Sequence, residues 1–294
     1  MTQLADMTDK TAVVTGATSG IGRVGAIRLG QAGARVIVHG RNRTAGEETV
    51  RRVEAAGGTA SFEAADFADL REVRELARRV RETTGDIDVL CNNAGLTALT
   101  HEVSEQGYEL HIAVNHLAPY LLTHELAPEL APDARIVTTS SNLHRLGRID
   151  LHHLERKSRA DTHERTRSGP RSGESRSGLS RLHRLAQVSN LSGFLAYCTS
   201  KLANLLFTRE LARRLSGERT ANCFHPGIIP QTGIERGIPF PLSVGWNGLE
   251  FVPGVTSTIA DGGEALAYIA ASSDIAGMTI RSRLTRKRSK NASR

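Results

Sequence analysis

The 294-residue chain has few cysteines, few aromatic residues and no long apolar run. Its three cysteines, Cys91, Cys198 and Cys223, are too few and too scattered for a disulfide framework, and with the histidines they form no pattern of metal ligands. No segment approaches the roughly 20 apolar residues that span a bilayer. The first ten residues also lack the apolar core of a signal peptide. These absences favour a soluble, cytoplasmic protein without a metal site.

The positive charge of the chain is concentrated in two segments with little apolar content. The formal net charge is +7, yet residues 155–187 contain nine Arg and Lys against four Asp and Glu, and residues 281–294 contain seven basic residues and no acid. The rest of the chain is therefore acidic. Because a nucleic-acid-binding domain carries its basic residues on folded elements, this distribution argues against a nucleic-acid partner. Both segments are predicted to be disordered.

Short apolar runs alternate with longer amphipathic stretches along the first ninety residues, which is typical of strand–helix units around a parallel sheet. We expect one α/β domain over residues 1–280, a Rossmann-type, doubly wound parallel sheet with helices on both faces, interrupted by the insertion at 155–187. Strands are expected at 11–15, 35–39, 61–65, 87–91, 135–139 and 221–225, with a weak last strand at 278–280. Helices are expected at 20–32, 45–56, 70–84, 197–215 and 263–271, with two more between 105 and 131, joined near Asn115.

A glycine-rich turn, TGATSGIG at 15–22, follows the first expected strand and leads into a helix. Glycines in such a turn let the backbone approach a pyrophosphate, whose charge is met by amide groups and by the helix N-terminus. This arrangement predicts a dinucleotide site. Its expected members are Gly16, Thr18, Ser19, Gly20, Ile21 and Gly22.

The residues after the second expected strand distinguish the two nicotinamide dinucleotides. An acid there bonds the ribose 2′-hydroxyl group, whereas an arginine meets a 2′-phosphate. The strand ends in VHGRNR at 38–43, with no acid and with Arg41 placed for a phosphate. NADP(H) is therefore favoured, with NAD(H) as the alternative.

Tyr197 and Lys201 stand four residues apart in the letters YCTSK, a spacing that places both on one face of a helix. A free phenol has a pKa of about 10, so proton transfer at neutral pH needs a nearby cation that stabilises the phenolate. Lys201 can supply that field. The pair is a candidate acid/base unit.

Several motifs occur together in the order and strand context of the short-chain dehydrogenase/reductase family. They are TGATSGIG, NNAG at 92–95, Asn115 within VNHLAPYLLT, SS at 140–141, YCTSK, and HPG at 225–227. The chain resembles this family over about residues 8–154 and 190–280. The stretches RIVTTSSNLHRLGRIDL and LAYCTSKLANLLFTRELARRL are similar to its retinol-dehydrogenase-like branch.

The resemblance implies an oxidoreductase that interconverts an alcohol and a ketone or aldehyde by hydride transfer with a nicotinamide cofactor. It implies that Tyr197 protonates the carbonyl oxygen, and that Lys201 holds the ribose and lowers the pKa of the tyrosine. Ser141 would bond the substrate oxygen, with Ser140 as the alternative, and Asn115 would hold a water molecule of a proton relay. The further cofactor contacts that the resemblance implies are Asp66, Asn92, Ala94, Gly95, Pro226 and Gly227.

The sequence departs from the family pattern in three places. Ser141 and Tyr197 lie 56 residues apart because the insertion separates them, Gln231 stands where a threonine is expected, and a basic run replaces the usual end of the last strand. The alternative function is therefore a catalytically silent nucleotide-binding protein of the same fold.

The expected substrate is a small lipophilic carbonyl compound or alcohol. Residues 238–253, IPFPLSVGWNGLEFVP, hold three aromatic residues in a stretch broken by glycine and proline. This composition predicts an apolar lid over the nicotinamide, with core packing as the alternative. The sequence is compatible with a homo-oligomer.

Overall fold

Six parallel strands form one sheet in the order β3-β2-β1-β4-β5-β6. The computed structural model describes residues 3–98, 102–149, 192–227, 229 and 257–278. Its strands are β1 (Thr11–Val14), β2 (Arg35–Gly40), β3 (Thr59–Ala64), β4 (Ile87–Asn92), β5 (Leu130–Thr139) and β6 (Thr220–Phe224). The expected Rossmann-type α/β fold is confirmed.

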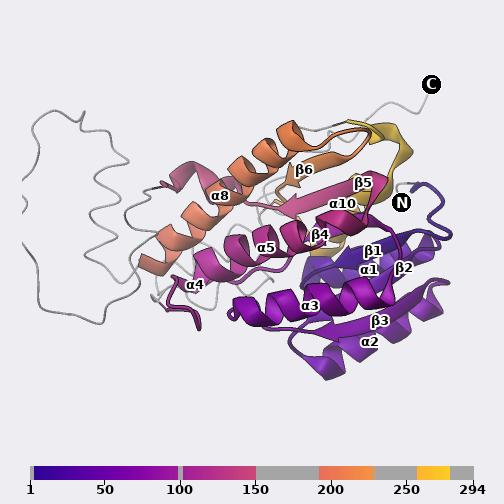
Figure 1. The fold of residues 1–294 in the computed structure, drawn as a ribbon, viewed down its shortest axis with the longest axis horizontal. Coiled ribbons are helices and arrows are strands. Elements are labelled where there is room, and N and C mark those ends of the chain that lie inside the picture. The colour runs from indigo at the N-terminus through magenta and orange to yellow at the C-terminus, as the bar shows by residue number, and fades with distance from the viewer. Residues whose placement is uncertain (1–2, 99–101, 150–191, 228, 230–256, 279–294) are drawn as a thin grey trace, which may run out of the picture.

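Helices cover both faces of the sheet (Figure 1). Strand residues alternate between the two cores, so Val14 packs in one and Val13 in the other. Because both faces are buried, the central strands are apolar along their whole length. One face carries α1 (Gly20–Gln31), α2 (Arg43–Ala55) and α10 (Ile259–Ala271), and the other carries α3 (Leu70–Thr83), α5 (Ala118–Glu125) and α8 (Ser192–Arg214).

Side chains cap the first turns of several helices. Asn42 caps α2, Asp69 caps α3, and Thr258 with Asp261 forms a reciprocal capping box on α10. The helix α1 differs, because Ser19 at its N-terminus makes no side-chain capping bond. The first-turn amide groups of α1 are thus left without a side-chain cap at the carboxyl edge of the sheet.

Two helices begin earlier than the sequence-based expectation, α8 at Ser192 rather than at residue 197 and α10 at Ile259 rather than at residue 263. The two helices expected between residues 105 and 131 are α4 (Leu110–Ile112) and α5, and the join expected near Asn115 is a π-helical turn, η1 (Ala113–Leu117). Apolar periodicity does not reveal such a turn, because the chain stays helical through it. In addition, β5 begins at Leu130 rather than at residue 135, and its pairing with β4 shifts register between Ile87 and Val89.

Short turns complete the described chain, namely η2 (Ala127–Glu129), η3 (Asn142–Leu146) and η7 (Ser273–Ile275). Every helix in the described ranges is too short or too polar to cross a bilayer. Several expectations lie outside the described residues: the insertion at 155–187, the lid at 238–253, Gln231, residues 279–280 of the last strand, and the tail at 281–294. Met278 is described and is not in a strand.

The order of strands reverses at β1, which pairs with β2 on one side and with β4 on the other. In open parallel sheets, ligands bind beyond the carboxyl ends of the strands at such a reversal. The fold therefore directs the search for a site to the segments that follow β1, β2 and β4.

Candidate active site

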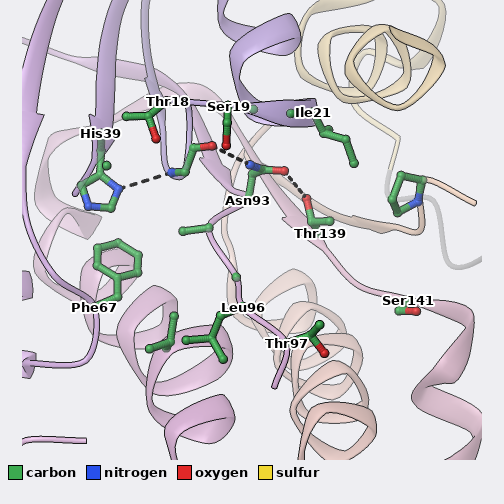
Figure 2. Close-up of a pocket in the computed structure, with 18 of the residues that line it drawn as sticks. Thr18, Ser19, Ile21, His39, Phe67, Asn93, Leu96, Thr97, Thr139 and Ser141 are labelled. Carbon is green, nitrogen blue, oxygen red and sulfur yellow. Dashed lines mark hydrogen bonds between the residues drawn. The ribbon is translucent and has the colours of Figure 1, made fainter. Parts of the chain in front are cut away.

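A cavity of about 720 Å³ opens beyond the carboxyl ends of β1, β2, β4 and β5 (Figure 2). Most of the site residues expected from the sequence line it. They are Gly16, Thr18, Ser19, Gly20, Ile21, Gly22, Arg41, Asp66, Ala94, Gly95, Ser141, Tyr197, Lys201, Pro226 and Gly227. Asn92 and Asn115 do not belong to the lining.

The glycine-rich turn leaves no room for side chains at two of its positions. Gly16 has a φ of +65°, and a Cβ atom built there would lie 2.7 Å from Cα of Ala94. A Cβ atom on Gly22 would press on the carbonyl oxygen of Gly16 and lie 2.5 Å from Nδ2 of Asn93. Together with the uncapped first turn of α1, this bare backbone offers amide donors to an anion.

Asn93, a residue that the sequence analysis did not single out, holds this turn in place. Its Nδ2 donates to the carbonyl oxygen of Thr15 at 3.0 Å. Its Oδ1 accepts from the hydroxyl of Thr139 at 3.2 Å (Figure 2). The hydroxyl of Thr15 accepts from the backbone N–H groups of Asn93 and Ala94, at 2.9 and 3.0 Å. These bonds join the carboxyl ends of β1, β4 and β5.

Asn92, expected as a cofactor contact, faces away from the cavity. It is buried, and its Nδ2 donates to the hydroxyl of Thr123 on α5 at 2.8 Å. Successive side chains of a strand point to opposite faces, and Leu90, two residues earlier, packs on the same side. The structure thus brings Asn93, and not Asn92, to the cavity. Alternation along β4 is the signal that could have shown this.

Tyr197 and Lys201 lie one turn apart on α8, and both line the cavity. Nζ of Lys201 lies 5.6 Å from the centre of the Tyr197 ring and donates to the carbonyl oxygen of Thr139 at 3.2 Å. Burial lowers the pKa of Lys201 to about 8. The lysine therefore remains mainly protonated at neutral pH.

Burial raises the pKa of Tyr197 to about 12, and a hydrogen bond with Ser141 acts in the opposite direction. The sequence-based expectation was a pKa lowered by Lys201. The residues of this chain do not produce that result, because desolvation of the phenolate outweighs the other effects. Sequence spacing placed the two groups together but could not reveal how deeply the phenol is buried.

The two serines after β5 have different partners. Ser140 is buried and donates its hydroxyl hydrogen to the carbonyl oxygen of Lys201 at 2.8 Å. Ser141 is bonded with the phenol of Tyr197, and its Oγ accepts from the backbone N–H of Leu143 at 3.3 Å. The serine beside the phenol is therefore Ser141.

Asn115 lies behind the cavity wall, in η1. Its Oδ1 accepts from the backbone N–H of Leu96 at 2.8 Å, and its Nδ2 lies 3.1 Å from the Leu96 carbonyl oxygen and 3.0 Å from Oγ of Ser200. A Cβ atom on Gly95 would lie 3.2 Å from Oδ1 of Asn115 and 3.3 Å from Nζ of Lys201. The absence of a side chain at Gly95 thus leaves room for both the amide and the ammonium group.

Comparison with known proteins agrees with this geometry. A family model described as short chain dehydrogenase matches residues 10–151. Retinol dehydrogenase 11 of Mus musculus is 37% identical over 225 residues, which cover 75% of this chain and 61% of that protein. A Streptomyces sp. (strain C5) protein, named as a daunorubicin C-13 ketoreductase, is 36% identical over 266 residues, 89% of this chain and 78% of that protein.

The chain belongs to the short-chain dehydrogenase/reductase family. The retinol-dehydrogenase-like character expected from the sequence is confirmed, and the named relatives of this enzyme family are dehydrogenases and reductases. Among solved structures, that of the angucycline C-6 ketoreductase LanV with bound NADP is 26% identical, with a TM-score of 0.67 and 95% of each chain covered. The chain spans 61% of the length of the mouse relative.

The cavity of this short-chain dehydrogenase/reductase fits a dinucleotide at its glycine-lined end. Gly16 and Gly22 pack without side chains against Ala94 and Asn93, and the first-turn amides of α1, which have no side-chain cap, are the donors that a pyrophosphate would meet. At the other end Gly227 has a φ of +91°, and a Cβ atom there would press on the hydroxyl of Ser257. Pro226 and Gly227 thus present a close-packed backbone to the cavity.

The mouth of the cavity carries a charged pair. Nη1 of Arg41 lies 3.7 Å from Oδ2 of Asp66, with exposed fractions of 68% and 41% for the two side chains. At such exposure the pair contributes little to stability, so the guanidinium can turn to another anion. The lining residues that sequence reasoning did not name are His39, Gly40, Ala65, Phe67, Asn93, Leu96, Thr97, Val114, Thr139, Ile229 and Ile259.

Proposed function

We propose that the protein is an NADP(H)-dependent oxidoreductase that interconverts an alcohol and a ketone or aldehyde on a lipophilic small molecule. One observation carries the proposal. The phenol of Tyr197, bonded with Ser141 and one turn from Lys201, lines the same cavity as the glycine-rich turn. The candidate proton donor and the candidate dinucleotide site thus lie in one cavity.

The roles follow from the partners of each side chain. When bound, the nicotinamide cofactor supplies or accepts the hydride. Tyr197 is protonated at neutral pH, as a free phenol already is, and burial, which raises its pKa to about 12, favours that form further. The protonated form is the one that donates a proton to a carbonyl oxygen. Ser141 holds the same oxygen, and the charge of Lys201 stabilises the phenolate that is left.

Arg41 supports a preference for NADP(H). It lies at the cavity mouth with a weak, solvent-exposed partner, and a guanidinium matches the geometry of a 2′-phosphate. No acid stands in the segment VHGRNR that ends β2, where it would bond a ribose hydroxyl. The NADP bound to the related LanV agrees with this choice.

Apolar side chains in the described part of the lining support a lipophilic substrate. Leu96, Val114, Ile229 and Ile259 line the cavity, from four separate segments. Cavities of this kind bind small molecules chiefly by apolar contact, and a few polar groups fix the orientation. Ser141 and Tyr197 would be those groups.

The deciding experiment replaces Tyr197 by Phe. We expect kcat for carbonyl reduction with NADPH to fall by about 10²- to 10⁴-fold, the usual loss when a general acid is removed. NADPH affinity, measured by cofactor fluorescence, should change little. Tyr120→Phe is the matched control, since Tyr120 is an exposed residue of α5 outside the cavity lining. Undiminished reduction by Tyr197→Phe would refute the mechanism.

A catalytically silent nucleotide-binding protein is the second candidate. It is favoured by the departures from the family pattern, namely the insertion that separates Ser141 from Tyr197 and the basic run after residue 280. Fluorescence titration that shows NADPH binding, without oxidation of NADPH by any member of an aldehyde and ketone panel, would support it. A cytoplasmic location and a homo-oligomer stay predictions.

A further inference from the structure

His111 is a buried histidine whose two ring nitrogens both have partners. It lies in α4, and its side chain is fully buried. The backbone N–H of Ala98 donates to Nε2 at 2.8 Å, and Nδ1 lies 2.7 Å from Oε1 of Glu109. Because a backbone N–H can only donate, Nε2 is an acceptor, and Nδ1 carries the hydrogen that is donated to Glu109. The two partners therefore select one tautomer of the ring.

Glu109 is held as firmly as the ring it orients. Its Oε2 accepts from the backbone N–H of Ile112 at 2.9 Å, which caps α4, and its side chain is 17% exposed. With a bond at each oxygen, the carboxylate cannot rotate without losing one of them. Glu109 thus fixes the direction in which His111 presents Nε2.

The accepting nitrogen of His111 holds a wall of the cavity, the segment of residues 96–98, called here the wall segment. Leu96 and Thr97 line the cavity (Figure 2). The backbone N–H of Ala98 donates to His111. Asn115, four residues after His111, binds both backbone groups of Leu96. The wall segment is therefore held at its two ends by side chains from one continuous helical stretch.

The ring of His111 also contacts the candidate acid. It meets the Tyr197 ring edge-on, with 6.2 Å between ring centres and 80° between planes. The same side chain thus touches the wall segment through a nitrogen and the tyrosine through the edge of its ring. His111 itself is not among the residues that line the cavity.

We propose that His111 is a positioning residue that fixes the wall segment and the Tyr197 ring relative to each other, with Glu109 selecting the tautomer of His111. The inference rests on the proposed function, because this relative position matters only where a substrate carbonyl meets the phenol beside the wall segment. A misplacement of about 1 Å at a reacting centre can cost on the order of 10²-fold in rate. His111 acts without touching the substrate or the cofactor.

Two substitutions test the two contacts of His111 separately, its hydrogen-bond acceptor and its aromatic ring. The side-chain carbonyl of His111→Gln can accept from the Ala98 N–H, whereas His111→Phe keeps a ring against Tyr197 and offers no acceptor. We expect His111→Phe to lower kcat/KM for the carbonyl substrate by about 10- to 100-fold, with the Kd of NADPH unchanged, and His111→Gln to recover most of that loss. His124→Phe, at an exposed position of α5, is the matched control.

Amide hydrogen exchange gives a measurement that does not depend on turnover. The Ala98 amide should exchange faster in His111→Phe and stay slow in His111→Gln, while the amides of β4 keep their wild-type rates. If the wild-type protein reduces no carbonyl compound, the proposed function fails, and the exchange rates still decide whether His111 holds the wall segment.

Three results would overturn the inference. They are wild-type kcat/KM and wild-type Ala98 exchange in His111→Phe, equal losses in the Phe and Gln variants, or a loss of NADPH affinity as large as the loss in kcat/KM. Where His111→Phe does not fold, Glu109→Gln takes its place, because its NH2 group replaces one of the two accepting oxygens and so faces the donor of His111 or of Ile112. Unchanged Ala98 exchange in that variant would count against the inference in the same way.

Discussion

The backbone N–H of Gly16 donates to Nδ1 of His39 at 3.4 Å, so the end of β2 holds the start of the glycine-rich turn (Figure 2). Because Nδ1 accepts, Nε2 carries the ring hydrogen and donates to the carbonyl oxygen of Ala65 at 3.2 Å. The ring also stacks on Phe67, with 4.3 Å between ring centres. Burial lowers the pKa of His39 to about 4, which preserves the neutral form that this arrangement needs.

This histidine should make the protein less stable in mild acid. Between about pH 6.5 and pH 4 the unfolded chain binds a proton at His39 and the folded protein does not, so the free energy of unfolding falls as pH falls through this window. The full effect is at most roughly 3 kcal/mol. Urea unfolding at several pH values measures it, with His39→Gln as the comparison that cannot titrate. Parallel pH curves for the two proteins would contradict the prediction.

The two adjacent serines should differ in what they affect. Ser141→Ala removes the group beside the Tyr197 phenol, and we expect kcat to fall by about 10²- to 10³-fold, as when a donor to a developing oxyanion is lost. Ser140→Ala leaves the Lys201 carbonyl without its hydroxyl partner and should lower the free energy of unfolding by about 1–3 kcal/mol. Steady-state kinetics and urea unfolding of both variants test this. A larger loss of kcat in Ser140→Ala would reverse the assignment.

Arg41→Ala should weaken the binding of NADPH selectively. Loss of a charged hydrogen bond of about 1.5–3 kcal/mol corresponds to a rise of about 10- to 100-fold in Kd. The Kd of NADH should hardly change, because NADH has no 2′-phosphate. Arg43→Ala is the matched control, as Arg43 is a nearby exposed arginine that pairs with Glu47 and does not line the cavity. Equal weakening of both cofactors would show that Arg41 does not read the phosphate.

Gly22→Ala should distort the glycine-rich turn. The added methyl group would meet the carbonyl oxygen of Gly16 and the amide of Asn93, so we expect weaker binding of NADPH and NADH alike and a loss of about 1–3 kcal/mol in unfolding free energy. Gly85→Ala, where an added methyl group has no neighbour within 4 Å, is the control. Fluorescence titration and urea unfolding report the two effects. Full cofactor affinity in Gly22→Ala would mean that the glycine-rich turn accommodates the added methyl group without weakening NADPH or NADH binding.

The part of the site that could be predicted from the sequence is the part encoded by local backbone geometry. A glycine-rich turn and a helical spacing are short-range properties, so both can be predicted from the sequence. They revealed Gly16, Gly22 and the pair Tyr197–Lys201. The join of two helices expected near Asn115 is confirmed, but its π-helical form could not be predicted, since such a turn leaves no mark on the apolar pattern.

The remainder depends on burial and on long-range partners. His39 and His111 form no motif, and each becomes informative only when its neighbours, Ala65 for one and Ala98 for the other, are known. The pKa of Tyr197 moves upward because of desolvation, which no spacing encodes. The sequence pattern therefore located the candidate catalytic groups more readily than it predicted their protonation and burial.

The bonds from Asn93 to Thr15 and Thr139 have a consequence for how the enzyme can diversify. All three residues precede the long insertion in the chain, so the clasp that supports the phosphate-binding turn is complete before that interruption begins. Changes downstream of Thr139 can remodel what the protein recognises without loosening this clasp. The clasp is thereby confined to residues 15–139, whereas the cavity as a whole takes lining residues from both sides of the insertion, such as Leu96 before it and Lys201 after it.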